Sequence, residues 1–254
     1  MPKNLPRKQK AESKKKQAIL SLFKKFGCHN PFSTSDLQEH SNKYSFRNHF
    51  DIPHLNSREN YPKELQEENI TLDLVSAGVY MFKEGFDKKF HQFEDVYLNE
   101  CFELKFVENS IYPKNLTSES DTINYCSKSG IFSHFFTNNY ENLSKVESFL
   151  GGRRQFRGKQ IELDGILEST ELNILTSIEG KNQKFSEFRI SQLLGPYEYY
   201  LSESGGSKDV SCLFLQKVTS SNYHTIKIWQ YKFNLDLEFK PIILIKKRQY
   251  KSFF

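Results

Sequence analysis

A buried β-strand that ends in charged residues is indicated by the sequence Ile174-Leu175-Thr176-Ser177-Ile178-Glu179-Gly180-Lys181. Glu179 and Lys181 are two residues apart, so on a strand their side chains project from the same face. Residues 161–167 read as a preceding strand, and the short polar link between the two strands predicts a β-hairpin. This hairpin would bring Asp164 beside Glu179 and Lys181 at one edge of a sheet.

Two carboxylates and an ammonium at one sheet edge suit the hydrolysis of a phosphodiester. Two acids can hold Mg²⁺, which prefers oxygen ligands and keeps several waters. The metal polarises the phosphoryl oxygen and lowers the pKa of a bound water, and a lysine stabilises developing negative charge and positions or deprotonates that water. Asp164, Glu179 and Lys181 are therefore the predicted catalytic residues, with Glu162 as the rival metal acid if the strand register differs. The alternative is a solvated, salt-bridged hairpin.

The segments on either side of the hairpin predict a mixed α/β fold. Upstream, strand-like patterns and one helical pattern are found at 72–75, 79–82, 102–107 and 118–137. Downstream, a helix and three strands are expected at 187–201, 210–218, 224–233 and 241–247. Because strands and helices alternate without strict βαβ order, the expected architecture is a mixed central β-sheet flanked by helices. Arg189 and Gln192, three residues apart, would share one face of the helix after the hairpin and contact phosphate or order the catalytic strand; the alternative is a plain surface helix.

The charge of the chain is concentrated at its N-terminus. Residues 1–25 contain nine Lys/Arg and one Glu, a net charge of +8 in a chain of +5, so the remainder carries −3. Such a basic arm indicates a polyanionic partner, with a solubilising tail as the alternative. The predicted contacts to DNA are Lys14, Lys15 and Lys16, joined by Arg153, Arg154 and Arg157 in a Gly-flanked loop before the catalytic strand.

Two short helices are predicted near the N-terminus. Residues 11–26 place apolar side chains on one helical stripe, and a second, capped helix is expected over 33–43. Such a pair can open a helix-turn-helix or winged-helix module. Residues 1–50 are therefore assigned to a basic helical region and residues 51–254 to a catalytic domain.

The motifs around the hairpin resemble those of bacterial type II restriction endonucleases of the PD-(D/E)XK superfamily. The matching motifs are Gln160-Ile161-Glu162-Leu163-Asp164-Gly165, Ser177-Ile178-Glu179-Gly180-Lys181-Asn182, and Phe188-Arg189-Ile190-Ser191-Gln192-Leu193 with Pro196-Tyr197. Leu163 stands where a proline often precedes the acid. The resemblance covers roughly residues 70–250 and implies a sandwich-like α/β core with Asp164, Glu179 and Lys181 as catalytic residues. It also implies that Glu119 approaches the metal.

This resemblance implies a sequence-specific, Mg²⁺-dependent endonuclease of double-stranded DNA in the bacterial cytoplasm, accompanied by a cognate DNA methyltransferase. Cutting both strands of a palindrome favours a two-fold homodimer. No membrane partner is expected, because no apolar run is long enough to span a bilayer. Two alternatives stay open: a non-catalytic DNA-binding regulator that uses residues 1–45, and a PD-(D/E)XK nuclease that acts in repair.

Overall fold

The chain forms two compact units in a computed structural model that describes residues 7–104, 116–140, 146–237 and 241–253. Unit 1 consists of Met1–Gln92, Gln155–Gln160 and Glu187–Arg189, and unit 2 consists of Phe93–Arg154, Ile161–Ser186 and Ile190–Phe254. The sequence placed a boundary at residue 50, whereas the main segment of unit 1 reaches Gln92. The reason is that the segment after residue 50 supplies strands that complete the core of the N-terminal helices.

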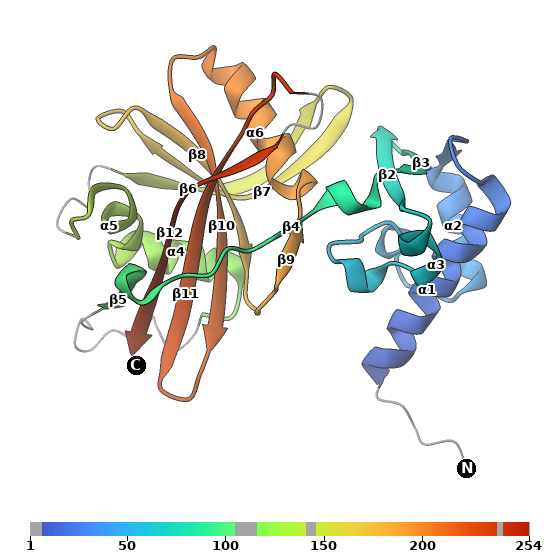
Figure 1. Cartoon of the computed structure of the whole chain (residues 1–254), viewed down its shortest axis with the longest axis horizontal. Coiled ribbons are helices and arrows are strands. Elements are labelled where there is room, and N and C mark those ends of the chain that lie inside the picture. The colour runs from blue at the N-terminus through green and yellow to red at the C-terminus, as the bar shows by residue number, and fades with distance from the viewer. Residues whose placement is uncertain (1–6, 105–115, 141–145, 238–240, 254) are drawn as a thin grey trace. The chain divides into compact units, whose positions relative to one another are not determined.

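Unit 1 combines helices with a small antiparallel sheet (Figure 1). Its main elements are α1 (Arg7–Phe26), β1 (Phe32–Ser33), α2 (Thr34–Lys43), α3 (Lys63–Glu67), β2 (Ile70–Ser76) and β3 (Val79–Glu84), with strand order β1-β3-β2. Two further strands, β4 (Phe90–Gln92) and β9 (Glu187–Arg189), pair with each other. The predicted helices are confirmed, since Ile19 and Leu22 of α1 are fully buried and Ser33 begins α2 with a capping box to Asp36.

Unit 2 contains most of a mixed sheet, which in the described part of the chain has seven strands. They are β5 (Cys101–Leu104), β6 (Glu147–Phe156), β7 (Lys159–Ser169), β8 (Ile174–Lys181), β10 (Asp209–Thr219), β11 (Tyr223–Phe233) and β12 (Ile242–Phe253), in the order β5-β12-β11-β10-β8-β7-β6. Only the ends of β6 and β7 next to their shared turn, within Gln155–Gln160, are grouped with unit 1. Strand β10 is parallel to β8, and β12 is parallel to β5. The structure therefore confirms the predicted mixed α/β architecture with a large sheet of parallel and antiparallel strands. Residues 105–107 of the strand expected at 102–107 lie outside the described residues.

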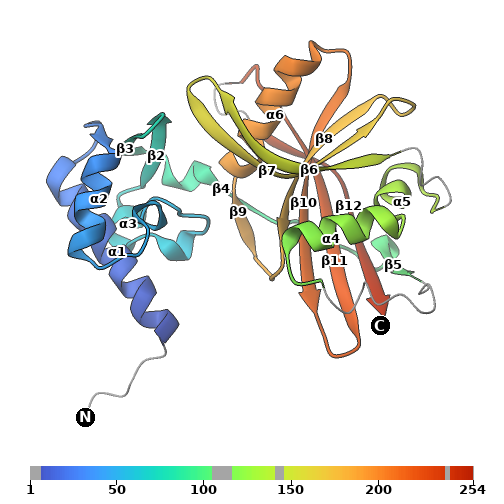
Figure 2. The same cartoon turned by 180° about the vertical axis from the view of Figure 1, so that it is seen from behind.

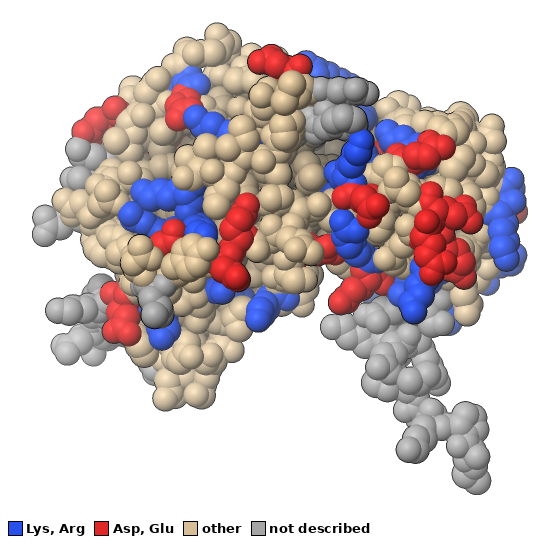
Figure 3. Space-filling model, viewed as in Figure 1, with Lys and Arg blue, Asp and Glu red and all other residues tan. Residues whose placement is uncertain are grey.

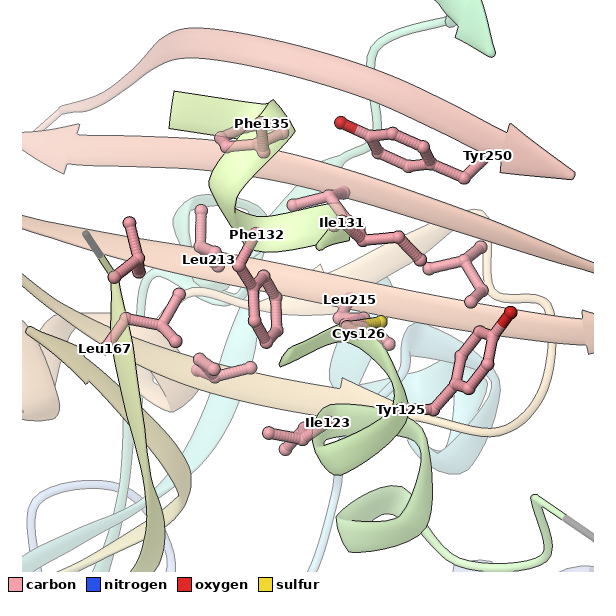
Figure 4. Packing of buried hydrophobic residues seen from close by; sticks show 14 of the residues in the cluster. Ile123, Tyr125, Cys126, Ile131, Phe132, Phe135, Leu167, Leu213, Leu215 and Tyr250 are labelled. Atoms are coloured by element: carbon pink, nitrogen blue, oxygen red, sulfur yellow. The ribbon is translucent and has the colours of Figure 1, made fainter. Parts of the chain in front are cut away.

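Helices cover both faces of this sheet. The elements are α4 (Glu119–Lys128), α5 (Ile131–Thr137) and α6 (Ser191–Ser204). Figure 4 shows Ile123 of α4 and Phe132 of α5 within the apolar cluster that includes Leu213 of β10. On the other face, Cys212 of β10 donates to the Leu193 carbonyl of α6, because neighbouring strand residues point in opposite directions.

Three local predictions differ from the structure. The helix expected at 118–137 is two helices, because Gly130 adopts φ 75° and separates them. The helix expected from residue 187 begins at Ser191. The loop expected around Gly151 is part of β6, where a Cβ on Gly151 would lie 1.6 Å from the Leu163 carbonyl oxygen, so glycine permits the strands to approach. Across the described ranges, the helices are too short or too polar to cross a membrane.

Candidate active site

The predicted catalytic residues lie together where strands β7 and β8 separate. The antiparallel ladder between these strands ends at the pair Gly165–Ile178. One residue further, the Asp164 carboxylate accepts a 2.8 Å hydrogen bond from the backbone N–H of Gly180. This side-chain bond replaces a main-chain bond and holds Asp164 against the end of β8, next to Glu179.

Lys181 connects three carboxylates. Its Nζ atom lies 2.8 Å from Glu179 Oε1, 3.3 Å from Glu119 Oε1 and 3.8 Å from Asp164 Oδ2. The predicted trio therefore shares one face of the hairpin, and Glu119 joins it from the first turn of α4. Three carboxylates surround one ammonium, so the cluster has more acidic groups than cations, which favours a further cation.

Asn182 fastens the first turn of α4 to the end of β8. Its side-chain nitrogen donates to the Thr117 carbonyl at 3.1 Å, and its oxygen accepts a 2.9 Å hydrogen bond from the Thr122 hydroxyl. These bonds hold Glu119 within reach of Lys181. From the sequence, no role was assigned to Asn182. The signal that could have indicated one is its position directly after Lys181 in the motif that begins at Ser177.

Burial controls the protonation of the cluster. The side chain of Glu179 is only 13% exposed. Its burial, with the nearby charges of Asp164 and Glu119, outweighs the attraction of Lys181 and raises its pKa to about 7. Burial lowers the pKa of Lys181, but the three carboxylates outweigh this effect and the pKa is raised. Lys181 is thus an ammonium at neutral pH, suited to stabilise negative charge rather than to accept a proton.

The donor set fits a hard cation with few protein ligands. Within the described part of the chain, no three Asp, Glu, His or Cys side chains are grouped closely enough to enclose a metal ion. Asp164 and Glu179, on adjacent strands, nevertheless offer carboxylate oxygens at one edge. Mg²⁺ is commonly held by one or two carboxylates and otherwise by water and substrate oxygens. These two residues are the ones that would hold it, with Glu119 beside them.

Gln192 lies beside this cluster. Its side-chain nitrogen donates a 2.7 Å hydrogen bond to Glu179 Oε1 from the first turn of α6. Because the carboxylate is also paired with Lys181, two donors fix its orientation. Gln192 therefore lies in direct contact with Glu179, and its supporting role stays a prediction.

Arg189 lies elsewhere, in β9 of unit 1. Its guanidinium donates to the Leu72 carbonyl at 2.7 Å and to Asp73 at 2.8 Å. Lys83 and Lys89 also contact Asp73. Burial would raise the pKa of Asp73, but the three cations outweigh burial and hold the pKa at about 2. Arg189 and Gln192 therefore do not share a helix face, and Arg189 has a structural role in unit 1.

We expect Arg189→Ala to destabilise unit 1 by about 2 kcal/mol. Removing one partner of a buried ion pair costs roughly 3–5 kcal/mol, and the two remaining lysines reduce that loss. Denaturant unfolding followed by a probe in unit 1 measures the change. Arg47→Ala, at an exposed position of the same unit, is the matched control. Equal stability of the two variants would show that the Asp73 contact contributes nothing.

The predicted DNA-contacting residues occupy α1 and the β6–β7 hairpin. Lys14 is exposed, whereas Lys15 donates to the His54 carbonyl at 2.5 Å and burial lowers its pKa. Lys15 is therefore engaged in packing, and Lys14 and the half-buried Lys16 are the better placed cations. The three predicted arginines, all exposed, are Arg153 and Arg154 in β6 and Arg157 in the turn that follows.

The fold and site define a mixed α/β protein with an acid–lysine cluster at a sheet edge. The family described as a domain of unknown function (DUF6997) matches residues 85–251, and the chain belongs to this family. The match includes the whole cluster and excludes α1. Neither the curated proteins nor the solved structures gave a match.

Proposed function

We propose that the chain is a Mg²⁺-dependent endonuclease of double-stranded DNA, of the PD-(D/E)XK type, that cuts at specific sequences as type II restriction enzymes do. The observation that carries the proposal is the cluster of Asp164, Glu179 and Lys181 at the point where β7 and β8 separate. A salt-bridged surface hairpin does not account for it, because Glu179 is nearly buried with a raised pKa.

Each side chain has a distinct part in the proposed hydrolysis. Bound Mg²⁺ supplies Lewis acidity at the phosphoryl oxygen and a more acidic water. Asp164 and Glu179 anchor the cation through their carboxylates. The Lys181 ammonium stabilises negative charge that develops on the phosphoryl oxygens. Glu119 and Gln192 orient Lys181 and Glu179 through the hydrogen bonds given above.

The topology of unit 1 supports DNA as the partner. The order α1-β1-α2-α3-β2-β3, with the sheet order β1-β3-β2, matches that of winged-helix modules. Positive and negative side chains are mixed over the face of unit 1 seen in Figure 3. That face therefore has no continuous positive patch that would bind DNA phosphates. The proposed contact therefore rests on Lys14 and Lys16 of α1.

The remaining parts of the proposal follow from cutting at specific sequences. A palindromic site is cut on both strands most simply by a two-fold homodimer. A cognate DNA methyltransferase would protect the host, and both proteins would act in the bacterial cytoplasm. The family match supports none of these parts directly.

A non-catalytic DNA-binding regulator is the second candidate, because the topology of unit 1 alone suits DNA binding. Mg²⁺-dependent cleavage separates the two. The full chain is incubated with plasmid DNA of known sequence with Mg²⁺ or with EDTA, and the product ends are mapped. Discrete ends that need Mg²⁺ support the proposal. Smeared products indicate a nuclease without sequence preference, such as one acting in repair, and intact plasmid with tight binding indicates the regulator.

We expect Gln192→Ala to lower the cleavage rate about tenfold at pH 7, within the roughly 10–100-fold typical of residues that orient metal ligands. The lost hydrogen bond favoured the charged form of Glu179, so the optimum should also move to higher pH. Rates measured from pH 6 to 9 test both effects. Gln92→Ala, at an exposed glutamine of β4, is the control. A rate that falls equally at every pH would contradict the assigned role.

A further inference from the structure

The β6–β7 hairpin extends beyond the main sheet as a two-stranded ribbon (Figure 2). Strand β8 pairs with β7 only over Gly165–Ser169, so the part nearer the turn has two strands. Arg157 and Gly158 form the turn with φ of 48° and 73°. Two successive positive φ values are typical of a type I′ turn, whose twist matches the flanking strands. The ribbon is thus a regular hairpin rather than a loop.

The turn determines which residues face each other. Counting outward from a two-residue turn pairs Gln155 with Gln160 and Arg153 with Glu162. The second pair is supported by a 2.9 Å contact between Arg153 Nε and Glu162 Oε1. Since residues two apart on a strand share a face, all four side chains belong to one face of the ribbon.

That face is open to solvent. Ile161, on the opposite face of the ribbon, packs against α6. Its Cγ2 atom lies only 3.1 Å from the position that a Cβ atom on Gly195 of α6 would occupy. Arg154, on the same side as Ile161, is close enough to Tyr200 of α6 for its charge to act on the pKa of that tyrosine. In contrast, the four side chains of the first face are all exposed. The paired glutamines are therefore presented outward.

The ribbon has the charge and chemistry to recognise duplex DNA. Residues 153–162 contain three arginines, one lysine and one glutamate, a net charge of +3. The major groove of B-DNA, about 12 Å wide, admits a two-stranded ribbon, and a glutamine amide can bond both N6 and N7 of adenine. A double-stranded RNA helix has a narrow major groove that side chains do not read, so the ribbon suits DNA.

We propose that the β6–β7 hairpin enters the major groove of duplex DNA, where Gln155 and Gln160 read adenine while Arg153, Arg154 and Arg157 contact backbone phosphates. The proposal rests on the proposed DNA substrate but not on the cleavage chemistry. The surface lies on one continuous hairpin, formed by β6 and β7. Gln160 precedes Asp164 by four residues of β7, about 13 Å of strand, so the adenines lie within about four base pairs of the cut.

Selection from a randomised duplex library tests this inference. The full chain in EDTA binds the library, and the retained duplexes are sequenced. The wild type should retain a common motif with at least one A·T pair. The double variant Gln155→Ala/Gln160→Ala should lose discrimination at that pair by about ten- to a hundredfold, while Gln92→Ala keeps the motif. Arg153→Ala and Arg154→Ala should weaken binding to every sequence and lower the slope of log affinity against log salt by about one each.

Three results would overturn the inference: a double variant that selects the wild-type motif, a motif without an A·T pair, or binding to double-stranded RNA as tight as to DNA. Absence of duplex binding would overturn it as well. Cleavage is scored separately. A normal selection result without Mg²⁺-dependent cleavage rejects the nuclease proposal and leaves the ribbon assignment standing, whereas wild-type product ends from the double variant reject the ribbon assignment alone.

Discussion

Asp164→Ala, Glu179→Ala and Lys181→Ala are each expected to lower the rate of DNA cleavage by at least about 1000-fold. The acid variants lose an oxygen that anchors Mg²⁺, and the lysine variant loses the ammonium that stabilises negative charge. The carboxylates of Asp164 and Glu179 both lie within 3.8 Å of Lys181 Nζ. Groups that act as one unit are not additive, so double variants should be little slower than single ones.

Binding measurements separate lost chemistry from lost folding. All three variants should still bind the preferred duplex in EDTA, and the two acid variants should bind more tightly because a negative charge near phosphate is removed. Glu103→Ala, at an exposed position of β5, is the control and should cleave normally. A Lys181→Ala variant that binds and cleaves like the wild type would remove Lys181 from the site, and the proposed function would fail with it.

The sequence was most informative where a two-residue period applies. Alternation along β8 places Glu179 and Lys181 on one face, and a short link brings β7 alongside, so the cluster with Asp164 could be predicted from spacing alone. The approach of Glu119 was implied only by the resemblance. It depends on a hydrogen bond between Thr122 of α4 and Asn182, the residue directly after β8 and 60 positions away in the sequence, which no local pattern reports.

Other features could not be predicted because tertiary contacts outweigh local preference. The segment from residue 187 was expected to be helical, yet Arg189 lies in strand β9 and forms an ion pair with Asp73, which is 116 residues away in the sequence. Two glycines before Arg153 indicated a loop, but Gly151 is needed because strand β7 passes too close for a side chain. The main segment of unit 1 extends past residue 50 to Gln92 for a similar reason, since residues 70–84 complete the core around α1.

Stability without metal is expected to fall by about 3 kcal/mol between pH 4.5 and pH 8 on account of Glu179 alone. Its pKa is raised from 4.5 to about 7 on folding, and each pH unit corresponds to about 1.4 kcal/mol. A raised pKa gives a contribution that is fully present below pH 4.5 and lost as the pH passes 7. Denaturant unfolding of wild type and Glu179→Gln in EDTA measures it, and the difference between the two curves isolates Glu179.

The difference between the wild-type and Glu179→Gln unfolding curves is needed because other groups also titrate between pH 4.5 and pH 8. Burial lowers the pKa of His134 to about 4, so its contribution is present above pH 6.5 and lost as the pH falls, opposite in direction to that of Glu179. Both proteins contain His134, so its effect cancels. Glu103→Gln, at an exposed carboxylate, should reproduce the wild-type curve. A Glu179→Gln curve with the wild-type pH dependence would mean that Glu179 keeps an ordinary pKa.

Magnesium should reverse this loss of stability, because the cation binds the deprotonated carboxylate. Binding then releases one proton below pH 7, so the apparent Mg²⁺ affinity should rise about tenfold per pH unit up to pH 7 and level off above it. Calorimetric titrations at pH 5.5, 6.5, 7.5 and 8.5 measure this profile, and Glu179→Gln should bind weakly at each pH. Strong binding with the same affinity at all four values would place the metal on other ligands. Stability and affinity thus test one physical cause, the buried charge of Glu179, through two independent measurements.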